Sequence, residues 1–210
     1  MANKIPIFDF GDTLVPCFRL QNQLMKDEFD EHGEEVPEFD VNNFRIYTPS
    51  EVKEYLELNG LEHADPLRLI EKYKERERKF MEQNAVFELL KKCSAEFGKT
   101  AIISDNTIEG REWLEQQLKA QKVPFEGLVV SEEVGAEKPD PEIFKEFLRR
   151  REEPAERFVY FGNNLNRDPA CEKVGIDFVF VDRYHSFGQD SGHHAKIDRL
   201  DLDSVRRAVR

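Results

Sequence analysis

The chain has 210 residues, of which 35% are charged, with a formal net charge of −12 and a pI near 5.0. This length suits one medium domain or one domain with an insertion, and the acidity argues against nucleic acid and anionic membranes as general partners. The sequence has no apolar run near the roughly 20 residues of a membrane span and no signal-peptide layout at its start, so we expect a cytoplasmic protein without a membrane partner. The three cysteines, Cys17, Cys93 and Cys171, are widely spaced, which favours reduced thiols over disulfides or a metal site.

The apolar run from Ile5 to Phe8 predicts a short, buried parallel strand. It ends on Asp9, and Gly11 and Asp12 follow directly. Ligands of open α/β sheets bind beyond the carboxyl ends of the strands, so a carboxylate at this point is well placed for chemistry. The alternative is a strand-end turn in which Asp9 and Asp12 cap local N–H groups.

Residues 16–98 carry helical patterns and no convincing strand pattern, which predicts a helical insertion after the first strand. The expected helices cover 18–29, 50–58, 66–80 and 85–97. The dense charges from Glu71 to Lys79 are typical of a solvated helix face. Three residues are candidates to line the inner face of the insertion, although such arginines are more often solvated: Arg19, Arg45 and Tyr47.

From residue 99 onward, short apolar runs alternate with helical patterns. Strands are expected at 100–103, 125–130, 158–161 and 178–181, with a last short strand at Ile197. Helices are expected at 108–122, from residue 139 to 148, from residue 168 to 174 and at 202–209, and residues 131–138 are expected to form a loop. This alternation predicts an α/β fold with a doubly wound parallel sheet.

Polar residues follow several of these strands, and the carboxyl ends of parallel strands meet at one edge of the sheet. Asp9 there could act as a carboxylate nucleophile that forms an aspartyl-phosphate. Ser104 and nearby backbone N–H groups could hold phosphoryl oxygens, and Lys138 could neutralise charge on the nucleophile and the phosphoryl group. Asp168 could help to bind Mg²⁺. The structural alternatives are a helix-capping Ser104, a surface Lys138 and an Asp168 that caps the helix beginning at Pro169.

Four segments in this order resemble the motifs of the haloacid dehalogenase-like hydrolase superfamily, in the branch with a helical cap after the first motif. They are Asp9-Phe10-Gly11-Asp12-Thr13-Leu14, Ile102-Ile103-Ser104-Asp105-Asn106, Gly135-Ala136-Glu137-Lys138-Pro139-Asp140-Pro141-Glu142-Ile143-Phe144 and Gly162-Asn163-Asn164-Leu165-Asn166-Arg167-Asp168. The third segment is the most specific. The resemblance implies a Rossmann-like core formed by residues 1–15 and 99–210, with a helical cap at 16–98.

The resemblance also implies roles for individual residues. The catalytic residues would be Asp9, Lys138 and Ser104, with Asp12 as a candidate acid/base. The phosphorylated substrate would bind to Ser104, Asp105, Asn106 and Lys138. The cofactor would be Mg²⁺, held by Asp9, the Gly11 carbonyl, Asn163 and Asp168.

Two residues depart from the family pattern. The family's phosphatases usually carry an acid/base aspartate two residues after the nucleophile, where this chain has Gly11. Asp12 could replace it only if the turn directs the Asp12 side chain to the place that the family's aspartate occupies. The fourth motif usually begins Gly-Asp, and Asn163 here replaces a metal-binding carboxylate with a neutral amide, which should weaken the Mg²⁺ site.

Three functions remain open at this stage. The leading hypothesis is a Mg²⁺-dependent phosphatase that acts on a small phosphorylated metabolite. The second is hydrolysis of a carbon–halogen bond, because the family's dehalogenases also lack the second aspartate and work without a metal. The third is a catalytically degenerate binding or regulatory protein, which the two missing carboxylates suggest. The sequence identifies neither the substrate nor the oligomeric state.

Overall fold

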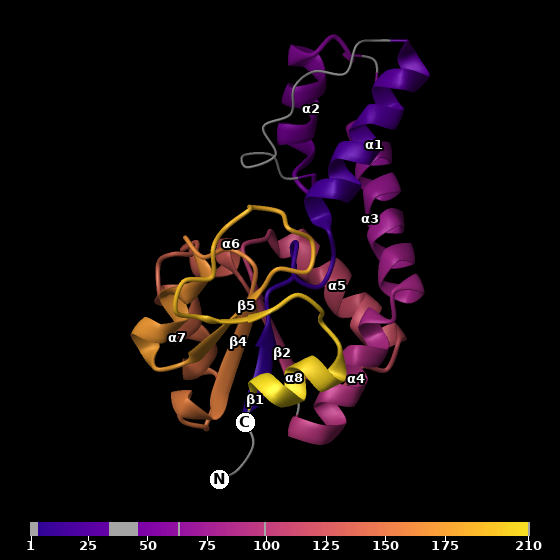
Figure 1. Cartoon of the computed structure of the whole chain (residues 1–210). Helices are drawn as coiled ribbons and strands as arrows, with labels where there is room; N and C mark the ends of the chain where they lie inside the picture. The colour runs from indigo at the N-terminus through magenta and orange to yellow at the C-terminus, as the bar shows by residue number, and fades with distance from the viewer. Residues whose placement is uncertain (1–3, 34–45, 63, 99, 210) are drawn as a thin grey trace.

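The computed structural model describes residues 4–33, 46–62, 64–98 and 100–209, and it shows a sheet with helices on both faces and further helices projecting from one end (Figure 1). All six strands are parallel, in the order β3-β2-β1-β4-β5-β6. They are β1 (Ile5–Phe8), β2 (Thr100–Ser104), β3 (Phe125–Val130), β4 (Phe158–Gly162), β5 (Asp177–Val181) and β6 (Ala195–Ile197). The predicted α/β fold, with a doubly wound parallel sheet and helices inserted between the first two strands, is confirmed.

The strand β1 lies in the middle of the sheet, between β2 and β4, and all four of its residues are buried. Its side chains alternate between the two faces, as a strand period of two requires. Phe8 packs in the apolar cluster on one face, and Ile7 packs in the cluster on the other. Asp9, the next residue, therefore lies at the carboxyl edge of the sheet, directly after a central strand.

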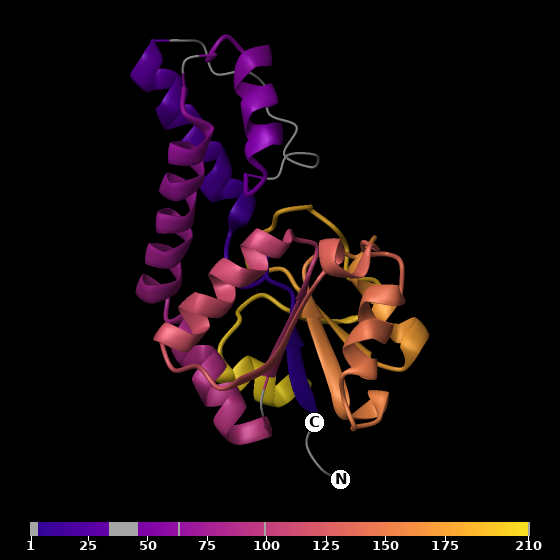
Figure 2. The same cartoon turned by 180° about the vertical axis from the view of Figure 1, so that it is seen from behind.

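Helices cover both faces of the sheet (Figure 2). On the Phe8 face, the core includes apolar residues of α4 (Val86–Phe97), α5 (Ile108–Ala120) and α8 (Leu202–Ala208). On the Ile7 face, the core includes residues of α7 (Glu142–Arg149) and the 3₁₀ segment η2 (Asp168–Val174). A second 3₁₀ turn, η1 (Ala155–Arg157), precedes β4. Helices on both faces define the doubly wound arrangement.

Three helices project beyond the sheet and are called the cap helices here: α1 (Cys17–His32), α2 (Pro49–Leu58) and α3 (Pro66–Gln83). They bury a core of their own, which includes Leu24, Phe29 and Tyr73. Sequence signals set their ends. Pro66 occupies the first turn of α3, and the Asp65 side chain accepts a hydrogen bond from the Leu67 N–H at 2.9 Å.

The fourth predicted helix of the insertion, α4, packs on the sheet. Its residues Phe87, Leu90 and Cys93 are buried in the same cluster as Phe8 and Ile102. By its packing, α4 thus belongs to the layer that covers the sheet. The predicted division of the chain at residues 15/16 and 98/99 remains a prediction.

One local prediction was wrong. Residues 131–138 were expected to form a loop, but Ser131–Val134 forms a one-turn helix, α6. Gly135 ends it in the left-handed conformation, with φ 74°, which glycine adopts without a steric penalty. A single turn is too short to show a helical period in the sequence.

The packing of α4 can be tested with two matched substitutions. Leu90→Ala should lower the free energy of unfolding by about 2–5 kcal/mol, because Leu90 is only 2% exposed within the core cluster. Leu58→Ala on α2 is the control, because Leu58 is 78% exposed, and it should change this free energy by about 0.5 kcal/mol or less. Urea denaturation measures both. Equal effects of the two substitutions would contradict the assignment of α4 to the core.

A second prediction concerns the last residue of β4. A Cβ atom at Gly162 would lie 2.6 Å from Cγ and 2.9 Å from Cβ of Asp168, which is itself fully buried. Gly162→Ala should therefore lower the free energy of unfolding by about 1–3 kcal/mol, as overpacking typically does. Gly127→Ala is the control on β3, because a Cβ there has no neighbour within 4 Å, and it should be neutral or stabilising. A lower melting temperature for Gly127→Ala than for Gly162→Ala would refute the close approach of Gly162 and Asp168.

Candidate active site

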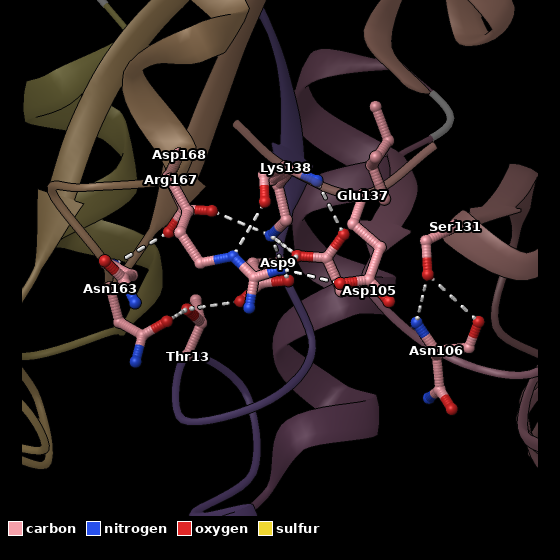
Figure 3. A network of polar contacts seen from close by, with 12 residues as sticks. Asp9, Thr13, Asp105, Asn106, Ser131, Glu137, Lys138, Asn163, Arg167 and Asp168 are labelled. Atoms are coloured by element: carbon pink, nitrogen blue, oxygen red, sulfur yellow. Dashed lines mark hydrogen bonds and ion pairs between the residues drawn. The ribbon is translucent and has the colours of Figure 1, made fainter. Parts of the chain in front are cut away.

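A buried ammonium group organises the carboxyl edge of the sheet (Figure 3). Lys138 Nζ lies 3.0 Å from Asp9 Oδ1 and 2.7 Å from Asp168 Oδ1, and the Lys138 side chain is only 4% exposed. It also donates to the Tyr160 hydroxyl at 3.0 Å, and this hydroxyl donates to the Ile103 carbonyl at 2.8 Å. Lys138 thereby connects groups from three neighbouring strands. Asp105 Oδ2 is more distant, at 3.8 Å from Nζ.

The charges of this cluster depend on one another. Burial raises the pKa of Asp9 to about 7, against the lowering effect of Lys138, and the carboxylate of Asp168 adds to the rise. Burial alone would lower the pKa of Lys138, but Asp168 and Asp9 outweigh it and raise this pKa well above its ordinary value. Lys138 is thus a permanent cation held next to Asp9.

The loop that carries Lys138 is fixed by hydrogen bonds from its neighbours. The Lys138 N–H donates to Asp105 Oδ1 at 2.9 Å, and the Lys138 carbonyl accepts from Arg167 Nε at 2.9 Å. Arg167 also pairs with Asp105 Oδ2 at 3.2 Å. Asp105 was predicted to bind substrate, and the structure shows that its two oxygens already hold Lys138 and Arg167.

Asn163 lies on the other side of Asp9. Its amide is best satisfied with the nitrogen toward the Gly11 carbonyl at 3.2 Å and Asp9 Oδ2 at 3.3 Å, because the amide oxygen would meet only acceptors there. Thr13 Oγ1 lies 3.2 Å from the same amide group and 3.5 Å from Asp9 Oδ2. The predicted metal-binding groups Asp9, Gly11 and Asn163 are therefore close together. Asp168, the fourth, has Oδ1 on Lys138 and accepts from the Asn164 N–H at 2.8 Å with Oδ2.

Asp12 lies in the turn after β1, and its side chain has hydrogen-bond partners outside the Asp9–Lys138 cluster. Asp12 has φ 56°, in the left-handed region that aspartate tolerates better than most residues. Its Oδ2 accepts from the Phe18 N–H at 3.4 Å and its Oδ1 from the Ser186 hydroxyl at 3.1 Å. Burial raises the pKa of Asp12 to about 6, with these two hydrogen bonds opposing the rise. The contacts of Asp12 are with α1 and with the segment after β5, and its role as acid/base remains a prediction.

A cavity of about 660 Å³ connects these residues with the cap helices. Its lining includes the predicted site residues Asp9, Gly11, Asp12, Ser104, Asp105, Asn106, Lys138, Asn163 and Asp168. Ser104 is 5% exposed at the end of β2, and the Asn106 side chain accepts a hydrogen bond from the Thr107 N–H at 2.8 Å. The structure thus brings all the predicted site residues to one cavity, while the role of each remains a prediction.

The three candidates for the inner face of the insertion have different outcomes. Tyr47 lines the cavity. Arg19 lines a separate pocket with Arg183 and Tyr184. Arg45 lies outside the described residues.

Sequence reasoning missed several side chains in or beside the cavity. Glu77 on α3 was assigned to a solvated face but is fully buried, and its carboxyl is hydrogen-bonded to the Tyr47 hydroxyl. The signal was present, because Glu77 lies on the buried stripe of Ile70, Tyr73 and Met81. Tyr160, which accepts a hydrogen bond from Lys138, lies in the run 158–161, which was interpreted only as an apolar strand.

A second group of metal-ligating side chains involves residues outside the cavity lining. Ligand atoms of Glu172, His193 and His194 lie within 4.8 Å of one another among the described residues. His194 packs edge-on against Phe178, with ring centroids 5.0 Å apart. Two of the three residues are exposed, and none of them lines the cavity described above.

No helix among the residues that the structure describes is long and apolar enough to cross a membrane.

Comparisons with solved structures show the fold. The chain is similar to the putative hydrolase YfnB from Bacillus subtilis bound to magnesium, with a TM-score of 0.65 and 17% identity over 100% of this chain and 99% of that one. It is similar to CbbY from Rhodobacter sphaeroides in complex with phosphate, with a TM-score of 0.64 and 16% identity over 97% and 99% of the two chains. A 2-haloacid dehalogenase from Pseudomonas syringae pv. Tomato DC3000 gives a TM-score of 0.60 at 19% identity, with 99% of both chains covered.

A curated relative and a family model extend the comparison. A glyceraldehyde 3-phosphate phosphatase from Methanopyrus kandleri is 30% identical over 86 residues, which is 40% of this chain and 37% of that protein. The match therefore spans well under half the length of this relative. The model of the haloacid dehalogenase-like hydrolases matches residues 6–181. This match covers both the strand that ends at Asp9 and the loop that carries Lys138, and the chain belongs to the haloacid dehalogenase-like hydrolase family.

Proposed function

We propose that this hydrolase is a Mg²⁺-dependent phosphatase that acts on small phosphorylated metabolites through an aspartyl-phosphate on Asp9. The single observation that carries the proposal is the pairing of a buried carboxylate with a buried cation at the cavity, Asp9 Oδ1 and Lys138 Nζ at 3.0 Å. The partial similarity to a glyceraldehyde 3-phosphate phosphatase and the similarity to the phosphate complex of CbbY support this substrate class.

The residues of the cluster suit two successive displacements at phosphorus. A carboxylate oxygen of Asp9 forms the new bond to phosphorus while the bond to the leaving oxygen breaks. Lys138 offsets the negative charge that gathers between Asp9 and the phosphoryl group. Water then attacks phosphorus, releases inorganic phosphate and restores the Asp9 carboxylate.

The residues around Asp9 fit a hard cation. Carboxylate and carbonyl oxygens are the ligands that Mg²⁺ prefers, and Asp9, the Gly11 carbonyl and Asn163 offer them within one small region. Asp168 would contribute a further carboxylate, which it shares with Lys138. When bound, Mg²⁺ would stabilise negative charge on the phosphoryl oxygens. The amide of Asn163 must turn its oxygen toward the ion, and it adds no charge.

The leaving group needs a proton, and Gly11 cannot provide one. Cys17 lies beside this position, since a Cβ at Gly11 would be 3.8 Å from Cys17 Sγ. Burial raises the pKa of the Cys17 thiol well above its usual range. A good leaving group, such as an aryl oxide or an acyl group, requires the least assistance.

Hydrolysis of a carbon–halogen bond remains the competing reaction, because Gly11 removes the acid that distinguishes phosphatases. A 2-haloacid brings a carboxylate in addition to the reacting carbon. Release of halide from 2-haloacids, measured beside release of phosphate from an aryl phosphate, separates the two reactions. Absence of both reactions, with and without Mg²⁺, would favour the binding-protein hypothesis.

The first functional prediction concerns the nucleophile. Asp9→Asn should lower phosphatase turnover of p-nitrophenyl phosphate by roughly 10⁴-fold or more, because the amide is not a nucleophile. The fold should remain stable, since Asp168 still pairs with the Lys138 ammonium group in the variant. Asp203→Asn is the control, because the Asp203 side chain is 77% exposed. Wild-type turnover in the Asp9 variant would refute the assignment.

The second functional prediction concerns the metal. Asn163→Asp should tighten Mg²⁺ binding by about tenfold or more, because it adds a charged oxygen ligand beside Asp9. Asn166→Asp adds the same charge to the same loop at an exposed residue and should change the dissociation constant far less. Isothermal titration, or the Mg²⁺ dependence of the melting temperature, measures both. Equal tightening by the two variants would point to general electrostatics rather than to ligation by residue 163.

A further inference from the structure

The cavity wall that lies opposite the strand ends differs in charge from the rest of the cavity lining. We call it the cap-side wall and define it by the lining residues of the cap helices and residues 46–47: Cys17, Phe18, Gln21, Ile46, Tyr47, Glu51, Tyr73 and Glu77. The two cations among the described lining residues, Lys138 and Arg167, both come from the strand-end loops. The cap-side wall offers none among its own described residues. Lys74 Nζ approaches the Tyr47 ring at 5.6 Å from its centroid but lies outside the lining.

The cap-side wall holds an unused hydrogen-bond acceptor. Gln21 is 8% exposed, and its Oε1 atom is buried without a hydrogen-bond partner among the described residues. Leaving a buried acceptor unpaired is unfavourable, so such an atom at a cavity usually meets a donor from a ligand or water. An amide oxygen accepts hydrogen bonds and does not donate them, so it suits a hydroxyl group and repels an anion.

A second hydrogen-bonding group lies behind it. Glu77 is fully buried, with the Tyr47 hydroxyl on one oxygen and Cys17 Sγ 3.4 Å from the other. Burial raises the pKa of Glu77 well above its ordinary value, against the lowering effect of the Cys17 hydrogen bond. The Tyr47 hydroxyl donates to this carboxyl, so both groups already have a hydrogen-bond partner within the wall.

These observations define a wall that has no cation among its described residues, that includes the acidic residue Glu51, and that holds one buried, unpaired acceptor, Gln21 Oε1. We propose that the cap-side wall selects phosphate monoesters whose organic part carries hydroxyl groups and no second anionic group. The inference rests on the proposed phosphatase function and specifies its substrate class. Against this wall, a carboxylate or a second phosphate would lose its hydration, approach Glu51 and meet no cation among the described residues, whereas a hydroxyl can donate to Gln21 Oε1.

A matched pair of substrates tests the selection. Glycerol 3-phosphate and 3-phosphoglycerate share a three-carbon skeleton and differ in that a hydroxymethyl group in the first is a carboxylate in the second. We expect kcat/KM to favour glycerol 3-phosphate by about tenfold or more, as a site built to bind a hydroxyl group discriminates. Hydrolysis of p-nitrophenyl phosphate reports the phosphatase chemistry itself. Its absence would refute the proposed function, and its presence with equal or reversed preference within the pair would refute this inference alone.

Substitutions of Gln21 locate the selection in the wall. Gln21→Arg places a cation there and should shift the ratio of the two kcat/KM values toward 3-phosphoglycerate by about tenfold or more. Gln23→Arg is the matched control, because Gln23 lies on the same helix, is exposed and does not line the cavity. An equal shift in both variants, or none in the Gln21 variant, would overturn the proposal.

Gln21→Met provides a second variant in case the arginine is not accommodated in the fold. It keeps the length of the side chain and removes the acceptor. We expect it to lower kcat/KM for glycerol 3-phosphate more than for p-nitrophenyl phosphate, whose organic part has no hydroxyl group. Equal losses on the two substrates would show that Gln21 supports the fold and does not read the substrate.

Discussion

The structure of the site depends on one buried ammonium group. Lys138 is shared by Asp9 and Asp168, and its positive charge opposes the rise in the pKa of Asp9 that burial causes. The parallel sheet makes the pairing possible, because it brings the ends of β1 and β4 together with the loop after α6. The sheet therefore fixes both the position of Asp9 and the charge that faces it.

The same cavity combines two environments that come from different parts of the chain. The strand ends contribute the charges, which suit a phosphoryl group and a hard cation. The cap helices contribute the unpaired acceptor of Gln21, the acidic residue Glu51 and the buried Glu77, and they bring no cation among the described residues. In our proposal, this difference lets one site hold a phosphoryl group at one end and select against a second anion at the other.

Much of this could be predicted from the sequence. Apolar runs that end in Asp9 or Ser104 reveal strand ends, and parallel topology brings such ends together without knowledge of side-chain positions. The direction of a side chain in a turn is not encoded in that pattern, so the contacts of Asp12 with Phe18 and Ser186 required the structure. Glu77 was misjudged because a charged run usually marks a solvated surface, although the spacing of Glu77 from Tyr73 and Met81 places it on the buried stripe of α3.

The central claim is that Asp9 carries the phosphoryl group between substrate and water. Two in-line displacements each invert the configuration at phosphorus, so their product retains it, whereas direct attack by water inverts it once. The most direct test is the stereochemical course of hydrolysis of a chiral, isotope-labelled thiophosphate ester by the native protein with Mg²⁺. The account predicts retention of configuration at phosphorus, and inversion would contradict it.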